Sequence, residues 1–462
     1  MRPLCGDILV VGLGVSGEAT ARYCAAHAAG GEPVHVTVVD STVSESLTVR
    51  ADELRKLGVD VLLECESIPG AFDLAIASPG VPARARIMEQ ARRTSAEVIS
   101  EIEFAYRRSE APWVAVTGTN GKTTVTSLLG HLLTGAGVAA SVVGNIGTPA
   151  ISVVDEVGPA GVIVAEVSSF QLALTTTFAP RVSVLLNVTP DHLDYHGDME
   201  QYAADKGRVF ARQGVDDTAI IDRDDPGSAG FIEHVRERGI QVLEVSVHGV
   251  PSGGAGLDAG GMLVLDGRDG HAVLVHRDRL LIRGTHNVSN ALAAAAAATA
   301  LGVSVEDIRE SLVTFAPIEH RLEPVATVAG VEYFNDSKAT NPDATAKALE
   351  AFEGRAVTVL LGGRNKGARF RDLGRLLADA GARVVVFGEA ADEILADIAP
   401  QGVDYKHVSD LAAAVHAAAK QAAEGDAVVL SPACASFDEF SGFAERGRVF
   451  RELVFARLEG GA

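Results

Sequence analysis

The sequence predicts an α/β protein with mostly parallel sheets, arranged as three domains. Short apolar runs rich in β-branched residues alternate with helical patterns along nearly the whole chain, which is typical of parallel strands covered by helices. The chain has 462 residues, of which 47% are apolar, and a prior of about 150 residues per domain suggests three cores.

The strand-like runs form three groups along the chain. They span residues 8–11, 34–39, 59–63 and 74–77 in the first group, 114–116, 161–165, 182–186 and 219–221 in the second, and 356–361, 383–387 and 427–430 in the third. A helical pattern from Glu18 to Ala29 separates the first two strands. Glycine-rich alternating runs between Val250 and Gly284 indicate a hairpin excursion, and the alanine-rich run 291–300 predicts a buried helix. We therefore expect domains at residues 1–100, 101–317 and 318–462.

The net charge and the cysteine pattern argue against several classes of protein. A formal charge of −21 disfavours a nucleic-acid or anionic-membrane partner, because such surfaces need clustered positive charge. No apolar run approaches the roughly 20 residues that cross a bilayer, and the N-terminal residues do not resemble a signal peptide. The four cysteines are scattered without a CxxC pair, which fits a reducing compartment. We expect a cytoplasmic protein, and the low aromatic content favours a monomer over an obligate dimer.

A glycine loop in the second group has the parts of a phosphate-binding site. Gly118-Thr-Asn-Gly-Lys-Thr-Thr124 follows an apolar strand and opens a helix. In such a loop, backbone N–H groups bind an anion, a lysine adds a point charge and a hydroxyl holds Mg²⁺. The common GxxxxGK[ST] spacing would need glycine where Val116 stands, so the loop is a variant. We predict that it binds a nucleoside triphosphate; the alternative, an ordinary turn, is disfavoured by the flanking strand and helix.

Polar residues follow two further strands of the second group. Glu166 ends one apolar run, and His192 lies shortly after the next. Because the carboxyl ends of parallel strands share one edge of a sheet, these side chains and Thr123 can converge on a metal ion. A lone histidine is more often structural, and a lone strand-end glutamate is more often solvated, but their repeated placement at strand ends favours a metal site.

The first group carries a second glycine motif, which keeps another class of protein open. Gly12-Leu-Gly-Val-Ser-Gly17 follows the first strand, and Asp40 follows the second. Taken alone, this is the dinucleotide fingerprint of a NAD(P)-dependent oxidoreductase. A lone GxGxxG is a weak signal, and that interpretation leaves the loop at 118–124 idle. A nucleotide switch that holds or hydrolyses ATP is a third alternative, although the sequence has no NKxD segment.

The loop at 118–124 resembles that of the Mur ligases and folylpolyglutamate synthetases, which activate a carboxylate as an acyl phosphate and then form an amide. Four C-terminal segments, 319–323, 335–342, 361–367 and 431–447, are similar in order and spacing to those of Mur ligases that add D-glutamate to UDP-N-acetylmuramoyl-L-alanine. The resemblance runs from about residue 7 to residue 450. It implies a Rossmann-like domain for the UDP substrate, a central P-loop domain for ATP and a Rossmann-like domain for the amino acid.

The same resemblance implies roles for residues of the central domain. Lys206 would carry a CO₂-derived carbamate and share metal ions, two Mg²⁺ with Mn²⁺ as an alternative. The catalytic residues would be Lys122, Glu166, His192 and Lys206, and the metal ligands Thr123, Glu166, His192 and Lys206. The ATP contacts would be Gly118, Thr119, Asn120, Gly121, Lys122, Thr123, Thr124, Asn287, Asn290, His320, Arg321 and Asp336.

The resemblance also implies contacts for the two other substrates. The UDP substrate would contact Val15, Ser16, Asp40, Ser41, Ser78, Gly80 and Asn145. D-Glutamate would contact Lys338, Thr340, Lys366, Ser436, Phe437 and Phe443. Phe437 stands where at least some family members have an aliphatic residue, and its contact is expected to be made by the backbone. Another amide ligase, joining L-alanine, a diamino acid or polyglutamate, stays open as an alternative.

Overall fold

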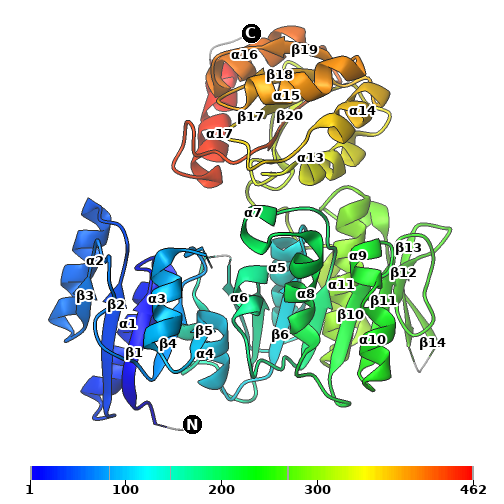
Figure 1. The fold of residues 1–462 in the computed structure, drawn as a ribbon. Coiled ribbons are helices and arrows are strands. Elements are labelled where there is room, and N and C mark those ends of the chain that lie inside the picture. The colour runs from blue at the N-terminus through cyan, green and yellow to red at the C-terminus, as the bar shows by residue number, and fades with distance from the viewer. Residues whose placement is uncertain (1–2, 83, 146, 268–269, 460–462) are drawn as a thin grey trace. The chain divides into compact units, whose positions relative to one another are not determined.

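The structure is a computed structural model that describes residues 3–82, 84–145, 147–267 and 270–459. These residues form three sheets flanked by helices (Figure 1), which confirms the predicted α/β class. The contacts divide the chain into two compact units, Met1–Val275 with Ser289–Leu312 and His276–Val288 with Val313–Ala462. The first unit holds two of the sheets, and the second unit holds the third.

The first sheet contains five parallel strands in the order β3-β2-β1-β4-β5. Its strands are β1 (Gly6–Val11), β2 (Val34–Val39), β3 (Asp60–Leu62), β4 (Leu74–Ala77) and β5 (Val98–Ser100). The helices of this region are α1 (Val15–Ala29), α2 (Glu45–Lys56), α3 (Arg86–Thr94) and α4 (Glu101–Arg107). The order reverses between β1 and β4, so the loop after β1 lies at a topological switch point, where α/β sheets bind ligands.

The second sheet is larger, with nine strands in the order β14-β13-β12-β11-β10-β9-β6-β8-β7. Its strands are β6 (Trp113–Thr117), β7 (Ala140–Gly144), β8 (Val162–Glu166), β9 (Val182–Leu185), β10 (Thr218–Asp222), β11 (Gln241–Ser246), β12 (Ala255–Leu257), β13 (Met262–Gly267) and β14 (Gly270–His276). The helices are α5 (Lys122–Gly135), η1 (Ala150–Ser152), α6 (Ser169–Ala173), α7 (Leu193–His196), α8 (Met199–Gly207), η2 (Arg208–Phe210), α9 (Pro226–Ala229), α10 (Ile232–Glu237), η3 (Arg277–Arg279), α11 (Thr285–Ala300) and α12 (Val305–Leu312). The predicted excursion extends this sheet as β12 to β14; its residues 268–269 lie outside the described part.

The two sheets of the first unit share one hydrophobic core. A single cluster of buried side chains runs from Ile8 and Val38 in the first sheet to Trp113 and Ile163 in the second. The joint expected near Ser100 is not a loose linker, because Ser100 ends β5 and at once caps α4, accepting from the backbone N–H of Glu103 at 3.3 Å. The first two sheets therefore belong to one compact unit.

The third sheet has six strands in the order β15-β16-β20-β17-β18-β19, and all neighbouring pairs are parallel except β15 with β16. Its strands are β15 (Glu323–Val328), β16 (Val331–Asn335), β17 (Val357–Gly362), β18 (Arg383–Phe387), β19 (Asp404–His407) and β20 (Ala427–Ala433). The helices are α13 (Pro342–Leu349), η4 (Glu350–Phe352), α14 (Arg371–Asp379), α15 (Ala391–Ile398), η5 (Ala399–Gln401), α16 (Leu411–Gln421) and α17 (Phe443–Glu459). Two buried clusters, one on each face, form its core.

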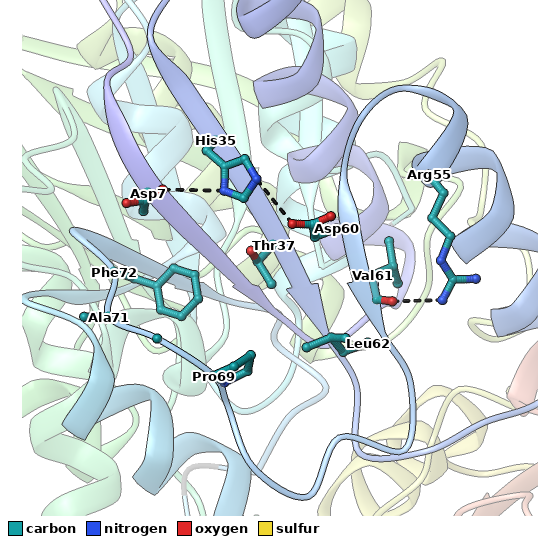
Figure 2. Close-up of a pocket in the computed structure, with 11 residues that line it drawn as sticks. Asp7, His35, Thr37, Arg55, Asp60, Val61, Leu62, Pro69, Ala71 and Phe72 are labelled. Carbon is teal, nitrogen blue, oxygen red and sulfur yellow. Dashed lines mark hydrogen bonds and ion pairs between the residues drawn. The ribbon is translucent and has the colours of Figure 1, made fainter.

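A cavity of about 560 Å³ is lined by Asp7 on β1, His35 and Thr37 on β2, all three residues of β3, and the segment before β4 (Figure 2). Figure 2 shows the His35 ring between two carboxylates, with Nδ1 3.5 Å from Asp7 Oδ1 and Nε2 3.3 Å from Asp60 Oδ2. Its lining contains none of the residues predicted to contact the UDP substrate. Among the described residues, no helix is long and apolar enough to cross a membrane.

Candidate active site

The glycine loop lies between the buried strand β6 and helix α5. Gly118 (φ +151°) and Gly121 (φ +87°) adopt backbone conformations that residues with a side chain rarely reach. A Cβ atom on Gly121 would lie 2.4 Å from Asn290 Oδ1. The Lys122 Nζ donates to the carbonyl oxygens of Gly118 and Thr119 at 2.9 and 2.8 Å, so the lysine folds back over the loop. The loop thus presents a lysine and the first N–H groups of a helix, which together suit a phosphate.

Two residues that the sequence analysis missed hold this loop in shape. Asn187, just after β9, accepts from Asn120 N at 2.8 Å and donates through Nδ2 to Asn120 O at 3.1 Å. Its carbonyl oxygen also accepts from Thr119 N at 2.8 Å. On the other side, the Tyr202 hydroxyl lies 3.1 Å from Thr119 Oγ1. The only sequence signal for Asn187 was its position directly after a buried strand, and Tyr202 gave none.

Thr123 and Glu166 meet at the carboxyl edge of the second sheet. Glu166 is buried at the end of β8, which pairs with β6, and its Oε2 accepts from Thr123 Oγ1 at 2.7 Å. Asn145 follows the next strand, β7, and its Nδ2 lies 3.5 Å from Glu166 Oε1. Three neighbouring strand ends therefore place a hydroxyl, a carboxylate and an amide together, as parallel pairing predicts.

Lys206 is buried beside the glycine loop rather than exposed on its helix. Its Nζ donates to Gly118 O at 2.8 Å and lies 4.5 Å from the centre of the Tyr202 ring. Burial lowers the pKa of Lys206 well below its usual value, the charge of Lys122 lowers it further, and Asp191 opposes both. The amine is therefore biased towards its neutral form, which is the nucleophilic form.

His192 lies in a left-handed backbone conformation (φ +52°) that is unusual for a residue with a side chain. Its ring packs edge-on to Phe170 at 4.9 Å between centroids, and its side chain is 37% exposed. It opens into a cavity of about 290 Å³ within the first unit. The cavity is lined by Pro79, Gly80, Pro82, Arg84, Phe170, His192 and Tyr195. A residue after β4 of the first sheet, Gly80, and a residue of the second sheet, His192, therefore share one cavity.

The glycine motif of the first sheet also forms a tight strand–loop–helix. A Cβ atom on Gly17 would lie 1.9 Å from Gly12 O, so α1 can approach β1 only with glycine at this position. Ser78 Oγ donates to Gly12 O at 2.8 Å, and Asp40 Oδ2 accepts from Leu13 N at 2.8 Å. Asp40 and Ser78 thus brace the loop, while Val15, Ser41 and Gly80 are exposed around it.

The site fits a magnesium ion only in part. Among the described residues, no group of three or more His, Cys, Asp or Glu side chains gathers closely enough to hold a metal. The Thr123 hydroxyl and the Glu166 carboxylate are hard oxygen donors, which Mg²⁺ prefers, and Mg²⁺ commonly takes one or two protein ligands together with substrate phosphates. The donor set therefore suits Mg²⁺ bound with a nucleotide rather than a closed protein cage.

The second unit gathers its predicted residues at the carboxyl ends of β16, β20 and β17. Asp336 is buried, accepts from Ser431 Oγ at 2.7 Å, and has its pKa raised to about 7 by burial. Lys338 Nζ lies 4.4 Å from the centre of the Phe443 ring, and the His320 ring lies 6.0 Å from the same ring. The loops after β17 and β20 pair through Arg364 and Ala435, and they carry the exposed Lys366, the buried Ser436 and the exposed Phe437.

The predicted ATP contacts do not all fall in one unit. Asn290 lies in the first unit, against Gly121. Asn287, one turn earlier on α11, groups with the second unit, and its Nδ2 donates to Arg283 O at 2.7 Å. His320 and Arg321 also belong to the second unit.

Arg446 is the most prominent residue of the second unit that the sequence analysis passed over. It is fully buried on α17, and its Nη2 donates to Ser337 O at 2.8 Å and Cys434 O at 3.1 Å, while its Nη1 lies 3.4 Å from Gly362 O. One guanidinium therefore ties together the ends of β16, β20 and β17. The Glu-Arg-Gly segment was visible in the sequence, but nothing in it indicated burial.

A glycine loop at a helix N-terminus, next to a buried threonine–glutamate pair, defines the class: this is a P-loop nucleotide-binding protein built on three α/β sheets. Residues 116–298 match the model of the Mur ligase middle domain, and residues 320–434 match the model of the Mur ligase glutamate ligase domain. The chain belongs to the Mur ligase family.

Individual relatives agree with this assignment. The chain is 42% identical over 458 residues to the UDP-N-acetylmuramoylalanine--D-glutamate ligase of Pelotomaculum thermopropionicum, covering 98% of both chains. It is 43% identical over 453 residues to the ligase of the same name from Salinibacter ruber, covering 96% of both. Among solved structures, MurF from Acinetobacter baumannii matches with a TM-score of 0.62 at 19% identity, covering 96% of this chain and 93% of that one. UDP-N-acetylmuramate-alanine ligase MurC from Thermotoga maritima matches with a TM-score of 0.59 at 20% identity, covering 98% and 99%. The two structures support the fold alone.

Proposed function

We propose that this protein is an ATP-dependent ligase that joins D-glutamate to UDP-N-acetylmuramoyl-L-alanine in cytoplasmic peptidoglycan precursor synthesis. The observation that carries the proposal is the similarity over nearly the whole chain, above 40% identity, to relatives that bear the name of this activity. The glycine loop with its Thr123–Glu166 pair gives the proposal a physical basis, because activating a carboxylate with ATP needs a site that binds phosphate and Mg²⁺.

The proposed reaction has two steps. A carboxylate oxygen of the alanyl group attacks the γ-phosphorus of ATP, the bond from that phosphorus to the β,γ-bridging oxygen breaks, ADP leaves, and an acyl phosphate is formed. The neutral amine of D-glutamate then attacks the acyl carbon, the carbon–oxygen bond to phosphate breaks, and the amine gives up a proton as the amide forms. Lys122 and the loop N–H groups stabilise the negative charge on the transferring phosphoryl group.

Thr123 and Glu166 would hold the magnesium, with His192 and Lys206 as further ligands. The ion would neutralise charge on the phosphate oxygens. For Lys206 we propose carbamylation by CO₂, in which the amine nitrogen bonds the carbon of CO₂ and a proton is released. The support is the burial of Lys206 and the lowering of its pKa, because only a neutral amine reacts with CO₂. The product is an anion whose carboxylate oxygens would add to the oxygen donors of Thr123 and Glu166.

The remaining predicted contacts are assigned as follows. The UDP group would be bound by Val15 and Ser16 at the start of α1 and by Asp40 and Ser41 after β2, and Ser78, Gly80 and Asn145 would contact the rest of that substrate. For ATP, Asn287 and Asn290 would contact the adenine side, and His320, Arg321 and Asp336 would be further nucleotide contacts. D-Glutamate is bound by Lys338, Thr340, Lys366, Ser436, Phe437 and Phe443, because two lysines on separate strand-end loops suit a dicarboxylate. We further propose a monomer with domains at 1–100, 101–317 and 318–462, since each of the three sheets falls within one of these ranges.

The test is phosphate release with Mg²⁺, ATP and UDP-N-acetylmuramoyl-L-alanine, comparing D-glutamate with L-glutamate, glycine, L-alanine and diaminopimelate. Release with D-glutamate alone, with a product heavier by one glutamyl residue, is the expected result. Release with a different amino acid would retain the acyl-phosphate chemistry and overturn the assigned substrate. No release with any of them would overturn the proposed function.

A further inference from the structure

A buried histidine that the proposed mechanism does not use lies between two residues that it does use. The side chain of His196, at the end of α7, has no exposed surface. Its Nε2 lies 2.9 Å from Ser169 Oγ on α6, and its Nδ1 lies 2.8 Å from Asp205 Oδ2 on α8. The other oxygen of Asp205 accepts from Gln201 Nε2 at 3.0 Å. Hydrogen bonds at both ring nitrogens fix the position and the plane of the imidazole.

The His196 ring also contacts two aromatic rings, Phe170 and Tyr202. Phe170 stacks on it with 5.3 Å between centroids and 6° between planes, and the same Phe170 ring receives His192 at 4.9 Å. Tyr202 lies 5.0 Å from His196, and Lys206 Nζ lies 4.5 Å from the centre of the Tyr202 ring. The Phe170 ring therefore lies between His196 and His192, and the Tyr202 ring lies between His196 and Lys206.

A serine–histidine–aspartate series also invites a different interpretation, as the nucleophile and base of a hydrolase. The surroundings argue against it. Ser169 is 3% exposed, within the first turn of α6, so no substrate carbon can reach its Oγ. A nucleophilic serine needs an accessible oxygen with oxyanion donors about 3 Å away. The series is buried on all three members and joins three short helices, which suits a structural brace rather than a reacting group.

We propose that His196 is a positioning residue that sets the places of His192 and Lys206 together. This inference rests on the proposed function, in which His192 and Lys206 act on the phosphoryl group and its metal. α6, α7 and α8 are short helices of 5, 4 and 9 residues, which intrahelical hydrogen bonds alone do not hold rigidly. The Ser169–His196–Asp205 series is the link that joins them, so loss of its hydrogen bonds shifts the Phe170 and Tyr202 rings and, with them, both site residues.

The test uses the full-length enzyme and the D-glutamate-dependent phosphate assay. His196→Phe keeps an aromatic ring for stacking and removes both hydrogen bonds, and Ser169→Ala removes one. We expect kcat to fall about 10- to 100-fold for His196→Phe, the usual range for residues that orient a metal site, and less for Ser169→Ala. The KM for D-glutamate should change less than about twofold, because its assigned contacts lie in the other unit. Because a smaller folded fraction would also lower the apparent kcat at unchanged KM, kcat is expressed per folded enzyme, with the folded fraction taken from Trp113 fluorescence.

Two further comparisons make the result specific. Asp205→Asn keeps an oxygen that accepts from the Nδ1–H group and should retain most of the activity that Asp205→Ala loses. His234→Phe, on the exposed face of α10, is the matched control and should behave as the wild type. Trp113 fluorescence reports whether each variant is folded, and Ser169→Ala decides the question if His196→Phe does not fold.

A folded His196→Phe or Ser169→Ala enzyme with the kcat of the wild type overturns the proposal. It is equally overturned if the KM for D-glutamate rises in parallel with the fall in kcat, or if His234→Phe loses as much activity. The wild-type measurement distinguishes failure of this proposal from failure of the proposed function. A wild-type enzyme without D-glutamate-dependent phosphate release would refute the proposed function instead.

Discussion

Replacing Glu101 by glutamine should stabilise the first unit at alkaline pH. Glu101 is fully buried at the start of α4; its Oε1 accepts from Ile151 N at 2.8 Å, while its Oε2 is buried without a hydrogen-bond partner among the described residues. Burial raises the pKa of Glu101 to about 7 from its ordinary value of 4.5, although hydrogen bonds from Ile151 and Ala150 oppose the rise. The folded protein therefore binds this proton more tightly than the unfolded chain does.

The sign and size of the effect follow from that difference. The stabilising contribution of the protonated carboxyl is complete below pH 4.5 and is lost as the pH rises through about 7. At 1.36 kcal/mol for each pKa unit, the loss amounts to about 3 kcal/mol, of which about 2 kcal/mol falls between pH 5.5 and 8.5. Glutamine cannot ionise, so the free energy of unfolding of Glu101→Gln, relative to the wild type, should rise by about 2 kcal/mol over that interval.

Urea unfolding followed by the fluorescence of Trp113 measures this quantity. Trp113 is the single tryptophan and is buried in β6, so it reports on the unit that contains Glu101. The lower pH of 5.5 stays above the sequence pI of about 5.0, where low net charge promotes association. Comparing the two proteins at each pH cancels the titration of the other groups, and the change of that difference between pH 5.5 and 8.5 cancels any pH-independent packing change.

Glu103, on the same helix, provides a control of opposite sign. Burial raises its pKa, but hydrogen bonds from Thr177 and Arg107 lower it more, so the net pKa lies below its usual value. Its ionised form contributes stability above pH 4.5, which is lost as the pH falls, and Glu103→Gln should be less stable than the wild type at pH 8.5. A pH-independent difference for Glu101→Gln, or a change of equal sign in both variants, would refute the reasoning.

Three other substitutions test the sites. Gly121→Ala should lower ATP affinity at least tenfold in an equilibrium binding assay, because its Cβ atom would lie 2.4 Å from Asn290 Oδ1 at a φ of +87°, and near-normal affinity would contradict that clash. Lys206→Met should remove D-glutamate-dependent phosphate release and any response to added bicarbonate, whereas the wild type should slow in CO₂-depleted buffer; a bicarbonate response in the variant would exclude the carbamate. Arg446→Met should lower the free energy of unfolding of the second unit by about 3 kcal/mol, since it leaves the buried carbonyl oxygens of Ser337 and Cys434 without their donor. Circular dichroism measures the stability, and the KM for D-glutamate shows whether the amino-acid site weakens as well.

The central parts of the fold could be predicted because their signals are local. All of the predicted apolar runs lie in or overlap observed strands, since central parallel strands such as β6 and β17 are buried along their whole length. The strands that escaped prediction lie mostly near sheet edges or alternate in burial: β19 is exposed at every residue, and β15 is only partly buried. Edge strands carry no continuous apolar run, so composition alone does not mark them.

Site residues that directly follow a strand could be predicted from the sequence. Residues whose position depends on packing between segments far apart in the sequence could not. Thr123 and Glu166 come together because β6 and β8 are neighbours, which the parallel pattern implied. The burial of Arg446 depends on the ends of three strands, and the contacts of His196 depend on three helices, so neither could be seen in any one segment. The sequence also could not show that the first two sheets share a core, because that depends on helix packing around α4.

That shared core has a consequence for substrate length. The Tyr23 hydroxyl on α1 accepts from Arg108 Nε, at the end of α4, at 3.1 Å and donates to Asp155 Oδ1, in the region of the second sheet, at 3.3 Å. The distance from the glycine loop after β1 to the loop at Gly118 is therefore fixed by the packing of the protein rather than by the bound ligand. Under the proposed function, a UDP-linked carboxylate whose reach is too short or too long fails to meet the phosphoryl group.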